Sequence, residues 1–447
     1  MKQHKMKPPQ MIAIGFFSII AFGTFLLMMP LSSASGQFTS LINALFTATS
    51  AVCVTGLAVV ETGVYWSGFG QLVILLLIQA GGLGFMTSAT LFALLLGKKI
   101  GLRSRIVLQE SHNVLSLTGV VRLAKMMILF SLSIEAVAAF VLWLRWGGQF
   151  GWVKSIWLGI FHSVSAFNNA GFDLFGQFYG GKAVSLMPFV DDPLVILVLG
   201  GLIVFGGLGF AVFMDIYKER KFSKLDLHTK IVLITTATLL IIGFLGIMTF
   251  EFSNPATLGN LSWKGKILAS LFQSITPRTA GYFSLDLAQA ASQTQLMMII
   301  LMFIGASPNS TGGGIKTTTF AVIILGLWAL IRGKDSVVIF ERTLQKEQIL
   351  KAMFIAMLSF LLLMVTVLVV LIVEPFSLMQ VLYESTSAFA TVGLSLGITP
   401  QLHTISKAML VFTMYAGRIG PLTLALALAA KGEKRNIKYP EEKIIIG

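Results

Sequence analysis

Eight apolar segments, each long enough to cross a lipid bilayer as a helix, run through this sequence. The chain is 55% hydrophobic and only 12% charged, which is far more apolar than a single water-soluble core requires. The segments therefore predict an all-α polytopic membrane protein. They are 11–30, 73–96, 121–144, 194–217, 230–250, 296–331, 349–373 and 408–430.

Taken in order, the eight segments form four consecutive pairs. A shorter apolar segment of about a dozen residues lies between the two members of each pair, and it is too short to cross a bilayer. These segments are 39–51, 152–165, 264–276 and 377–388. Each leads into a glycine-bearing loop, and the four loops read "SAVCVTG", "SAFNNAG", "ITPRTAG" and "SAFATVG". We therefore expect four tandem units, each made of an outer helix, a half-membrane pore helix, a loop and an inner helix.

The loop glycines recur at a nearly constant interval. Gly56, Gly171, Gly281 and Gly393 are separated by 115, 110 and 112 residues, which indicates an internal repeat. The expected units are repeat 1 at 1–97 with pore loop 50–57, repeat 2 at 98–218 with pore loop 165–172, repeat 3 at 219–333 with pore loop 275–282 and an intramembrane loop at 305–316, and repeat 4 at 334–431 with pore loop 387–394. Residues 432–447 are expected to form a cytoplasmic tail.

Positive charge sets the expected orientation. Of 33 lysines and arginines, 24 fall at the two ends and in the three linkers between repeats, in 1–10, 97–125, 216–230, 331–351 and 431–447. Lysine and arginine concentrate in cytoplasmic loops, so we expect both termini in the cytoplasm and the protein in the cytoplasmic membrane. This distribution accounts for the net charge of +14 without a nucleic-acid partner.

The pore loops would then enter from outside. Acids in the outer connections, among them Glu61 and Asp173, either concentrate cations at an outer mouth or are ordinary solvated loop residues.

Non-helical backbone at membrane depth must be buried in protein or line a watery path, because lipid cannot satisfy its N–H and C=O groups. Four loops that converge on one axis meet this requirement. Rings of backbone carbonyls replace the hydration shell of a monovalent cation, and glycine permits the positive φ that turns successive carbonyls inward. The sequence thus predicts one central pore in a pseudo-fourfold arrangement. Its filter residues are Val54, Thr55, Gly56, Asn169, Ala170, Gly171, Thr279, Ala280, Gly281, Thr391, Val392 and Gly393.

At these residues the chain resembles the Trk/Ktr/HKT superfamily of K⁺ transporters, whose subunits contain four such units related to K⁺-channel subunits. "VTG", "NAG", "TAG" and "TVG" are similar to the first half of the K⁺-channel filter "TVGYG". Further resemblance lies in "GASPNSTGGGIKTTT" (305–319) and "YAGRIGPLT" (415–423). The length and span number favour the KtrB-type subunit over the longer TrkH type.

The resemblance implies K⁺ uptake, with K⁺ held at the filter residues only. In plant relatives a serine at the first filter glycine accompanies Na⁺ transport, whereas all four positions here are glycine. It also implies a homodimer in membrane lipid, and a cytosolic KtrA-type regulatory ring that binds adenine nucleotides. No cofactor is expected in this chain, and a role of Na⁺ as activator stays open. The single cysteine, Cys53, excludes a multi-cysteine metal site.

The third inner segment is too polar in its middle for an unbroken helix. Pro308 removes a backbone donor, and the three glycines that follow at 312–314 are poor helix formers. We expect two half-helices joined by a polar loop that gates the path beneath the filter; a passive kink is the alternative. The gate residues would be Ser307, Pro308, Asn309, Ser310, Thr311, Gly312, Gly313, Gly314 and Lys316.

Arg418 is expected within the membrane, where a charge costs on the order of 3 kcal/mol. The resemblance places it near the ion path, as an electrostatic barrier or as a brace that holds a filter loop against an acid such as Glu384. Arg278 would be either a pin behind the third loop or a barrier. The glycines of "GGLGF" at 81–85 and 206–210 are expected to serve close helix packing.

Three other interpretations fit parts of this sequence. "STGGGIKTT" resembles a phosphate-binding loop, but Ile315 separates glycine from lysine and the surroundings are apolar. A membrane-embedded enzyme would use His162 as base with Asp173 as its partner, yet the other repeats carry neither residue. A cation-coupled carrier of Na⁺ and K⁺ with alternating access remains an alternative that sequence does not separate from a channel-like pore.

Overall fold

The computed structural model describes residues 8–84, 87, 120–334, 336–428 and 442, and these residues are mostly helical. The described residues contain four helices that are long and apolar enough to span a membrane: α1 (Pro8–Met28), α7 (Val120–Phe150), α11 (Leu227–Glu251) and α15 (Lys346–Val373). Each is the predicted outer helix of one repeat. The all-α membrane fold expected from the sequence is confirmed.

The other elements of the first two repeats follow in the expected order. Repeat 1 contains the 3₁₀ turn η1 (Pro30–Ser32), α2 (Leu41–Val52), α3 (Thr62–Tyr65) and α4 (Gly68–Gly82). Repeat 2 contains α8 (Trp152–Phe167), η2 (Phe175–Phe178), η3 (Met187–Phe189), α9 (Pro193–Leu208) and α10 (Phe210–Glu219). The basic segment 97–119, residues 1–7 and the second half of segment 73–96 lie outside the described residues, apart from Thr87.

The last two repeats are built in the same way. Repeat 3 contains η4 (Phe222–Lys224), α12 (Trp263–Ile275), η5 (Leu287–Gln289), α13 (Ser292–Phe303) and α14 (Thr317–Ile331). Repeat 4 begins with a two-stranded hairpin, β1 (Val338–Ile339) and β2 (Arg342–Thr343), ahead of α15. It also contains α16 (Leu378–Ala390), η6 (Thr399–Gln401), α17 (Thr404–Ile419) and α18 (Pro421–Leu428). The predicted tail, 432–447, lies outside the described residues except for Glu442.

Two of the four half-membrane helices begin at a capping residue whose side chain accepts a backbone hydrogen bond. Ser377 forms a capping box with Gln380 at the start of α16, and Ser262 accepts a hydrogen bond from the Gly265 N–H at the start of α12. The predicted segments 39–51, 152–165, 264–276 and 377–388 agree with α2, α8, α12 and α16 to within a few residues at each end.

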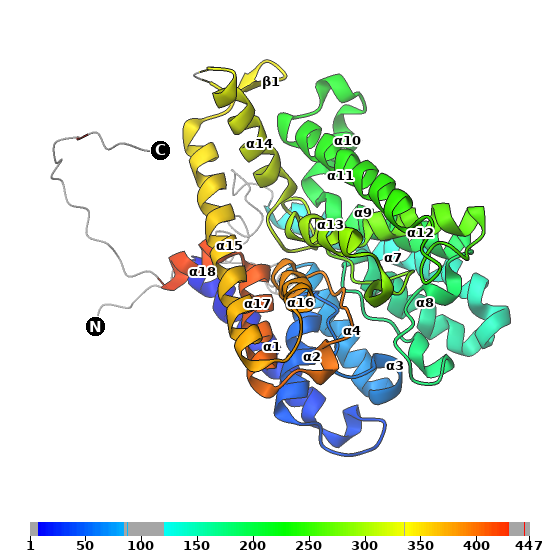
Figure 1. Cartoon of the computed structure of the whole chain (residues 1–447). Coiled ribbons are helices and arrows are strands. Elements are labelled where there is room, and N and C mark those ends of the chain that lie inside the picture. Colours follow the sequence, from blue (N-terminus) through cyan, green and yellow to red (C-terminus); the bar gives the residue numbers. More distant parts are fainter. Residues whose placement is uncertain (1–7, 85–86, 88–119, 335, 429–441, 443–447) are drawn as a thin grey trace, which may run out of the picture.

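The four repeats close into a cycle. The inner helix of each repeat packs against the pore helix of the next, in the pairs α4 with α8, α9 with α12, α13 with α16 and α17 with α2. The last of these pairs brings the inner helix of repeat 4 against the pore helix of repeat 1, and Figure 1 shows α17 beside α1 and α2. The centre of the cycle is therefore surrounded by short helices and loops.

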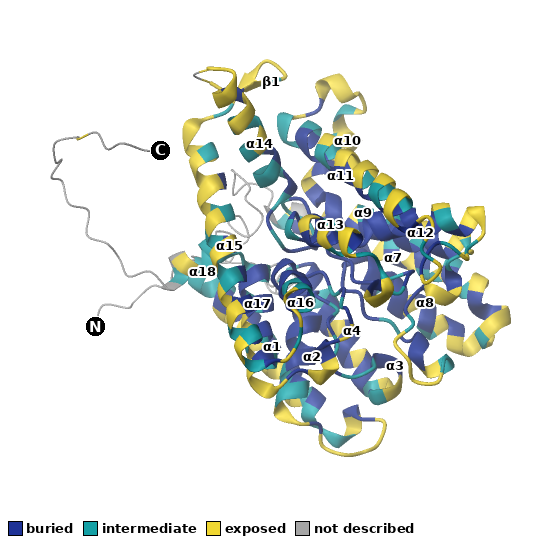
Figure 2. Cartoon of the chain, viewed as in Figure 1, coloured by how far each residue is buried: buried dark blue, intermediate teal, exposed yellow. Residues whose placement is uncertain are grey.

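Burial follows the same plan. The long helix α15 presents large apolar side chains outward, among them Phe354, Phe360 and Ile372, whereas the pore helices are buried along most of their length (Figure 2). An apolar outward face suits lipid rather than water.

The inner helices differ from the prediction, because the break expected only in repeat 3 also occurs in repeats 2 and 4, while in repeat 1 the helix α4 ends at Gly82, just before Gly84. In repeat 2, α9 and α10 meet at Gly209 with a bend of 92°. Gly84, Gly209, Gly314 and Gly420 all have positive φ, between 69° and 93°. A left-handed residue ends a helix, and glycine adopts that conformation without penalty. The interpretation of segments 194–217 and 408–430 as uninterrupted spans was therefore wrong.

Candidate functional site

Each pore loop alternates left-handed and ordinary backbone at the same positions. The loop glycines Gly56, Gly171, Gly281 and Gly393 have φ values of 86°, 69°, 84° and 95°. Two residues before each of them, Val54, Asn169, Thr279 and Thr391 also have positive φ, between 52° and 69°. The positive φ expected of the glycines is confirmed. The sequence did not predict it for the other four, because non-glycine residues rarely adopt it.

The four glycines lie side by side in a closed ring. A Cβ atom built on Gly171 would lie 2.5 Å from the Ala280 carbonyl oxygen, and one on Gly281 would lie 2.6 Å from that of Val392. In the same way, Gly393 faces the carbonyl of Thr55, and Gly56 faces that of Ala170. Every loop therefore presses its glycine onto the carbonyl that precedes the glycine of the next loop. Only a residue without Cβ permits this approach.

The filter carbonyls of this ring accept no hydrogen bond within the described part of the chain. Among the residues that the structure describes, none donates a hydrogen bond to the carbonyl oxygens of 54–56, 169–171, 279–281 or 391–393. The side chains of these loops are buried. Since buried carbonyls are normally satisfied, a ring of bare ones offers ligands to a cation.

The ends of the second and third loops are fastened by hydroxyl groups at the ends of their pore helices. Ser165 donates to the Phe172 carbonyl (2.8 Å), and Thr276 donates to the Tyr282 carbonyl (2.5 Å). The hydroxyl of Tyr282 reaches back to the Phe172 carbonyl of the neighbouring loop (3.0 Å). These bonds fix the second and third loops at the residues that follow their glycines, and so they hold the carbonyls of these two loops in place.

The two asparagines of "SAFNNAGFD" have different partners. The Asn168 amide points away from the ring and donates to Glu135 Oε1 (3.1 Å) and to Gln79 Oε1 (3.1 Å). The Asn169 amide is hydrogen-bonded to the hydroxyl of Thr279, 3.2 Å away in the third loop. Sequence reasoning missed Glu135 and Gln79. An acid in the middle of apolar segment 121–144 was the signal that could have found the first.

The intramembrane loop lies against three of the four pore loops. The Thr311 hydroxyl is hydrogen-bonded to the Phe167 carbonyl of repeat 2 (3.4 Å). Gly312 lies against Thr279 and Gly313 against Thr391, so closely that a Cβ on either glycine would clash. The break into α13 and α14 is therefore confirmed, and the loop between them lies directly behind the ring.

The broken end of α9 also holds this loop. The N–H groups of Ser307 and Thr311 donate to the carbonyls of Gly207 (3.0 Å) and Gly206 (3.2 Å), and Phe210 N–H donates to the Asn309 carbonyl (3.1 Å). The packing role predicted for the glycines of "GGLGF" is confirmed at Gly206, where a Cβ would strike the Phe167 carbonyl. The last glycine of that motif has the additional role of ending the helix.

Arg418 and Lys316 bind backbone carbonyls rather than acids. The Arg418 guanidinium donates to the Thr311 carbonyl of the intramembrane loop and to the Gly81 carbonyl of α4. The Lys316 ammonium donates to the carbonyl of Gly312 (2.6 Å). The suggested pairing with Glu384 is wrong: Glu384 accepts from Thr399, and no carboxylate in the described part of the chain pairs with either base. The Gly81 carbonyl lies in the last turn of α4, where helix carbonyls attract a cation, and the other two carbonyls belong to the intramembrane loop.

The remaining charged candidates also have clear positions. His162 is buried, with Nδ1 bonded to the Leu158 carbonyl (2.8 Å) and Nε2 bonded to the Leu174 N–H (3.3 Å). It therefore has no ring nitrogen left for Asp173, which rules out the proposed catalytic pair. Arg278 is 4% exposed, and its Nε and Nη2 have no hydrogen-bond partner among the described residues.

Two acids lie together on the side where the pore helices begin. Glu61 caps α3 by accepting from the Val64 N–H (2.8 Å), and Asp173 accepts from the Phe175 N–H (3.0 Å). Burial, and then the charge of Asp173, raise the pKa of Glu61 to about 7. Burial raises the pKa of Asp173 to about 6. The charge of this pair therefore changes near neutral pH.

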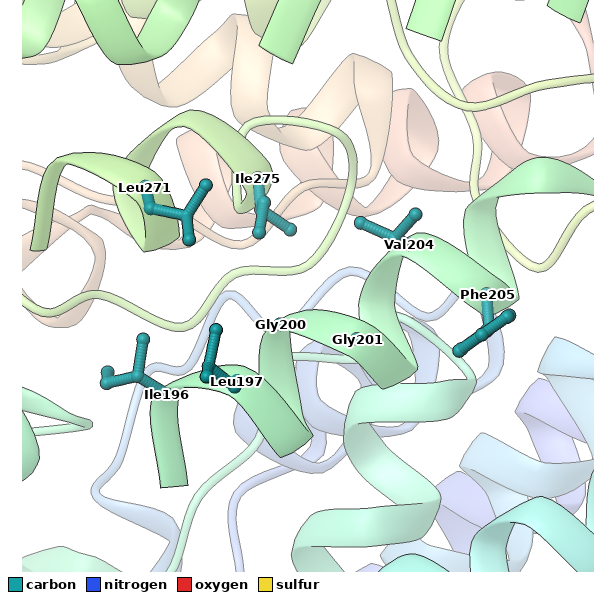
Figure 3. A pocket seen from close by; sticks show the side chains of 8 residues that line it. All are labelled: Ile196, Leu197, Gly200, Gly201, Val204, Phe205, Leu271 and Ile275. Carbon is teal, nitrogen blue, oxygen red and sulfur yellow. The ribbon is translucent and has the colours of Figure 1, made fainter. Parts of the chain in front are cut away.

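An apolar pocket of about 260 Å³ lies between α9 and α12, away from these groups (Figure 3). Leu271 and Ile275 face α9 across it, and no charged side chain lines it. A cation finds no ligand there. The candidate site is therefore the ring of loops.

Comparisons with known proteins agree with this geometry. The family model of the TrkH cation transport proteins matches residues 2–439. Ktr system potassium uptake protein B of Bacillus subtilis is 45% identical over 99% of this chain and 97% of its own length. Potassium/sodium uptake protein NtpJ of Enterococcus hirae is 40% identical over 99% of this chain and 98% of its own. The potassium transporter TrkH from Vibrio parahaemolyticus has a similar structure, with a TM-score of 0.70 at 19% identity, covering 96% of this chain and 86% of that one.

Proposed function

Because this chain belongs to the TrkH family of cation transport proteins, we propose that it mediates K⁺ uptake across the cytoplasmic membrane through a channel-like pore. Members of this family transport ions and are not enzymes. The observation that carries the proposal is the closed ring of four loops whose carbonyls accept no hydrogen bond within the described residues. The relatives named for potassium uptake support K⁺ as the ion.

The filter holds the ion through backbone oxygen atoms. Three successive residues in each loop supply carbonyls, and alternating positive φ turns them toward a common centre. The carbonyls replace the water that the ion loses on entry. The side chains of Asn169 and Thr279 are hydrogen-bonded to each other and Thr391 packs against Gly313, so we do not need these side chains as ligands.

The intramembrane loop 305–316 acts as the gate. It lies against residues of pore loops 2, 3 and 4, and Arg418 connects it to α4 of repeat 1. A segment that lies against three pore loops behind the ring, and that Arg418 links to the first repeat, crosses the ion path. Arg418 and Lys316 add positive charge there, which opposes a passing cation.

Control from the cytoplasm requires a partner. The Bacillus subtilis relative is named as part of a Ktr system, which supports a multi-component assembly. We infer a homodimer in the membrane and a cytosolic ring of regulatory domains that binds adenine nucleotides and moves the gate loop. Na⁺ as an activator belongs to the same proposal.

Rb⁺ or K⁺ uptake into liposomes that contain the purified chain tests the function directly. We expect selective uptake of K⁺ and Rb⁺ over Na⁺. The control is Gly281→Ser, in which a side chain would enter the ring. Liposomes with folded protein and no cation flux above protein-free vesicles, with or without the regulatory partner, would contradict the proposal.

A carrier with alternating access is the second candidate, and the broken inner helices favour it, since discontinuous helices form the ion sites of many carriers. Single-channel recording separates the two. Unitary currents support a pore, whereas transport without them supports a carrier.

A further inference from the structure

Glu135 is a carboxylic acid in the middle of the outer helix α7, and it is only 3% exposed. Ionisable side chains are rare within membrane spans and mark functional positions, because burying them away from water is unfavourable. Neither the carbonyl ring nor the intramembrane loop uses this acid directly. The hydrogen bonds of Glu135 show which elements it connects.

Three donors from three different elements converge on one oxygen of Glu135. Oε1 accepts from Ser131 Oγ in α7 (2.8 Å), from Asn168 Nδ2 in the second pore loop (3.1 Å) and from Gln79 Nε2 in α4 (3.3 Å). Oε2 has no partner among the described residues. Oε1 therefore joins the outer helix of repeat 2, the inner helix of repeat 1 and the pore loop.

The other three pore loops have no such anchor at the corresponding position. Asn168 comes three residues before its loop glycine, and the residues at that place in the other loops are Cys53, Arg278 and Ala390. None of the three donates a side-chain hydrogen bond to a carboxylate among the described residues. Within the part of the chain that the structure describes, the second loop alone is tied by its side chain to an acid in an outer helix.

We propose that Glu135 is a specificity-determining positioning residue, which fixes Asn168 and through it the second quadrant of the carbonyl ring. Asn168 directly precedes Asn169, whose φ of 59° is unfavourable for a side-chain-bearing residue and must be held by its surroundings. The next carbonyl, that of Ala170, is the one that Gly56 faces. Discrimination between K⁺ and Na⁺ depends on the spacing and number of such carbonyls. This inference rests on the proposed K⁺ filter.

The test compares Glu135→Ala with Glu135→Gln by measuring the ratio of Rb⁺ to Na⁺ flux in liposomes. Glutamine keeps an acceptor oxygen for Asn168, whereas alanine removes it. We expect alanine to lower the ratio roughly three- to tenfold, the effect of one lost hydrogen bond to a buried carboxyl group, and glutamine to restore most of it. An unchanged ratio in folded Glu135→Ala, or equal losses in both variants, would overturn the proposal.

Glu251→Ala is the matched control. Glu251 is also a fully buried acid in an outer helix, but it accepts from Ala291 N–H (2.8 Å) and Thr294 Oγ1 at the start of α13, and not from a pore loop. This variant should lose thermal stability and keep the flux ratio. A fall in the ratio equal to that of Glu135→Ala would show that any buried acid has this effect, which also overturns the proposal.

A double-variant cycle tests whether Glu135 affects the flux ratio through Asn168. If Glu135 acts through Asn168, Asn168→Ala lowers the ratio by a similar factor, and the pair together lowers it no further. Additive losses contradict the route. Asn168→Ala also carries the test should Glu135→Ala fail to fold. A wild-type protein without selective flux refutes the proposed function, whereas selective flux that Glu135→Ala and Asn168→Ala leave intact refutes only this inference.

Discussion

At the scale of single residues, the four loop glycines are constrained twice, by positive φ and by contact with a neighbouring loop. A side chain at any of them would both strain the backbone and push on a carbonyl of the ring. Gly397 separates these two effects, because its φ is 87° but no atom lies within 4 Å of the place where its Cβ would be.

Each of the substitutions Gly56→Ser, Gly171→Ser, Gly281→Ser and Gly393→Ser should weaken the preference for K⁺ over Na⁺, since the displaced carbonyl no longer fits K⁺. Growth at low K⁺ and Na⁺ exclusion measure this in a strain that lacks its own K⁺ uptake. Gly397→Ser should resemble the wild type. Wild-type K⁺ affinity and Na⁺ exclusion in all four ring variants would refute the filter assignment.

Cys53 tests whether side chains take part in ion binding. It is buried one residue before the left-handed Val54, and it is the only thiol in the chain. Cys53→Ser should transport at close to the wild-type rate, because backbone oxygens and not sulfur hold the ion. Complete loss of transport in a folded, membrane-inserted variant would argue for chemistry at the side chain.

The acid pair Glu61 and Asp173 predicts a dependence on external pH. Their pKa values, raised to about 7 and about 6, leave both largely neutral at pH 5 and charged at pH 8. Rising pH therefore adds negative charge on the proposed outer side, and the apparent KM for K⁺ should fall roughly twofold to tenfold through local cation attraction. The double variant Glu61→Gln, Asp173→Asn should remove this slope. An equal slope in both proteins would disprove the assignment.

At the scale of elements, the boundaries of the pore helices could be predicted because capping residues and apolar length both encode them. The break of the third inner helix could be predicted from Pro308 and its glycines. The breaks at Gly209 and Gly420 could not, because a glycine in an apolar helix serves packing or a break equally well in sequence. Only the contacts in the structure show which role a glycine has. Here Gly206 packs against the Phe167 carbonyl, and the nearby Gly209 ends α9.

Deletion of residues 309–314, or Lys316→Ala, should raise K⁺ flux and reduce dependence on the regulatory partner. The deletion removes the segment behind the ring, and the substitution frees the Gly312 carbonyl and removes a positive charge. Arg418→Gln should act in the same direction, since it releases Thr311 from α4. Flux into liposomes at matched protein density is the measurement.

Lys154→Ala, at the exposed start of α8, is the control for the loss of a lysine and should leave flux unchanged. Equal or lower flux from correctly folded loop-deleted protein would show that the loop is a passive kink.

At the scale of the whole molecule, the period of the loop glycines predicts four units, and the cyclic packing of inner helices on pore helices agrees with that expectation. The sequence does not predict which contacts differ between units. Glu135 and Gln79 serve only the second loop, while Arg418 connects the gate loop to the first repeat. Repetition reveals what the units share, and their individual functions depend on residues that break the repetition.

The closed ring of loops has a consequence for how such a filter changes. In a tetramer of identical subunits, every mutation appears in four copies at once. Here one gene encodes all four quadrants, so a substitution alters one quadrant and leaves three intact. Variants with one, two, three and four serine-substituted glycines would form a dosage series within one polypeptide. Substitutions in evolution can also change one loop at a time, and such a history would produce sequence differences among the four loops like those seen here.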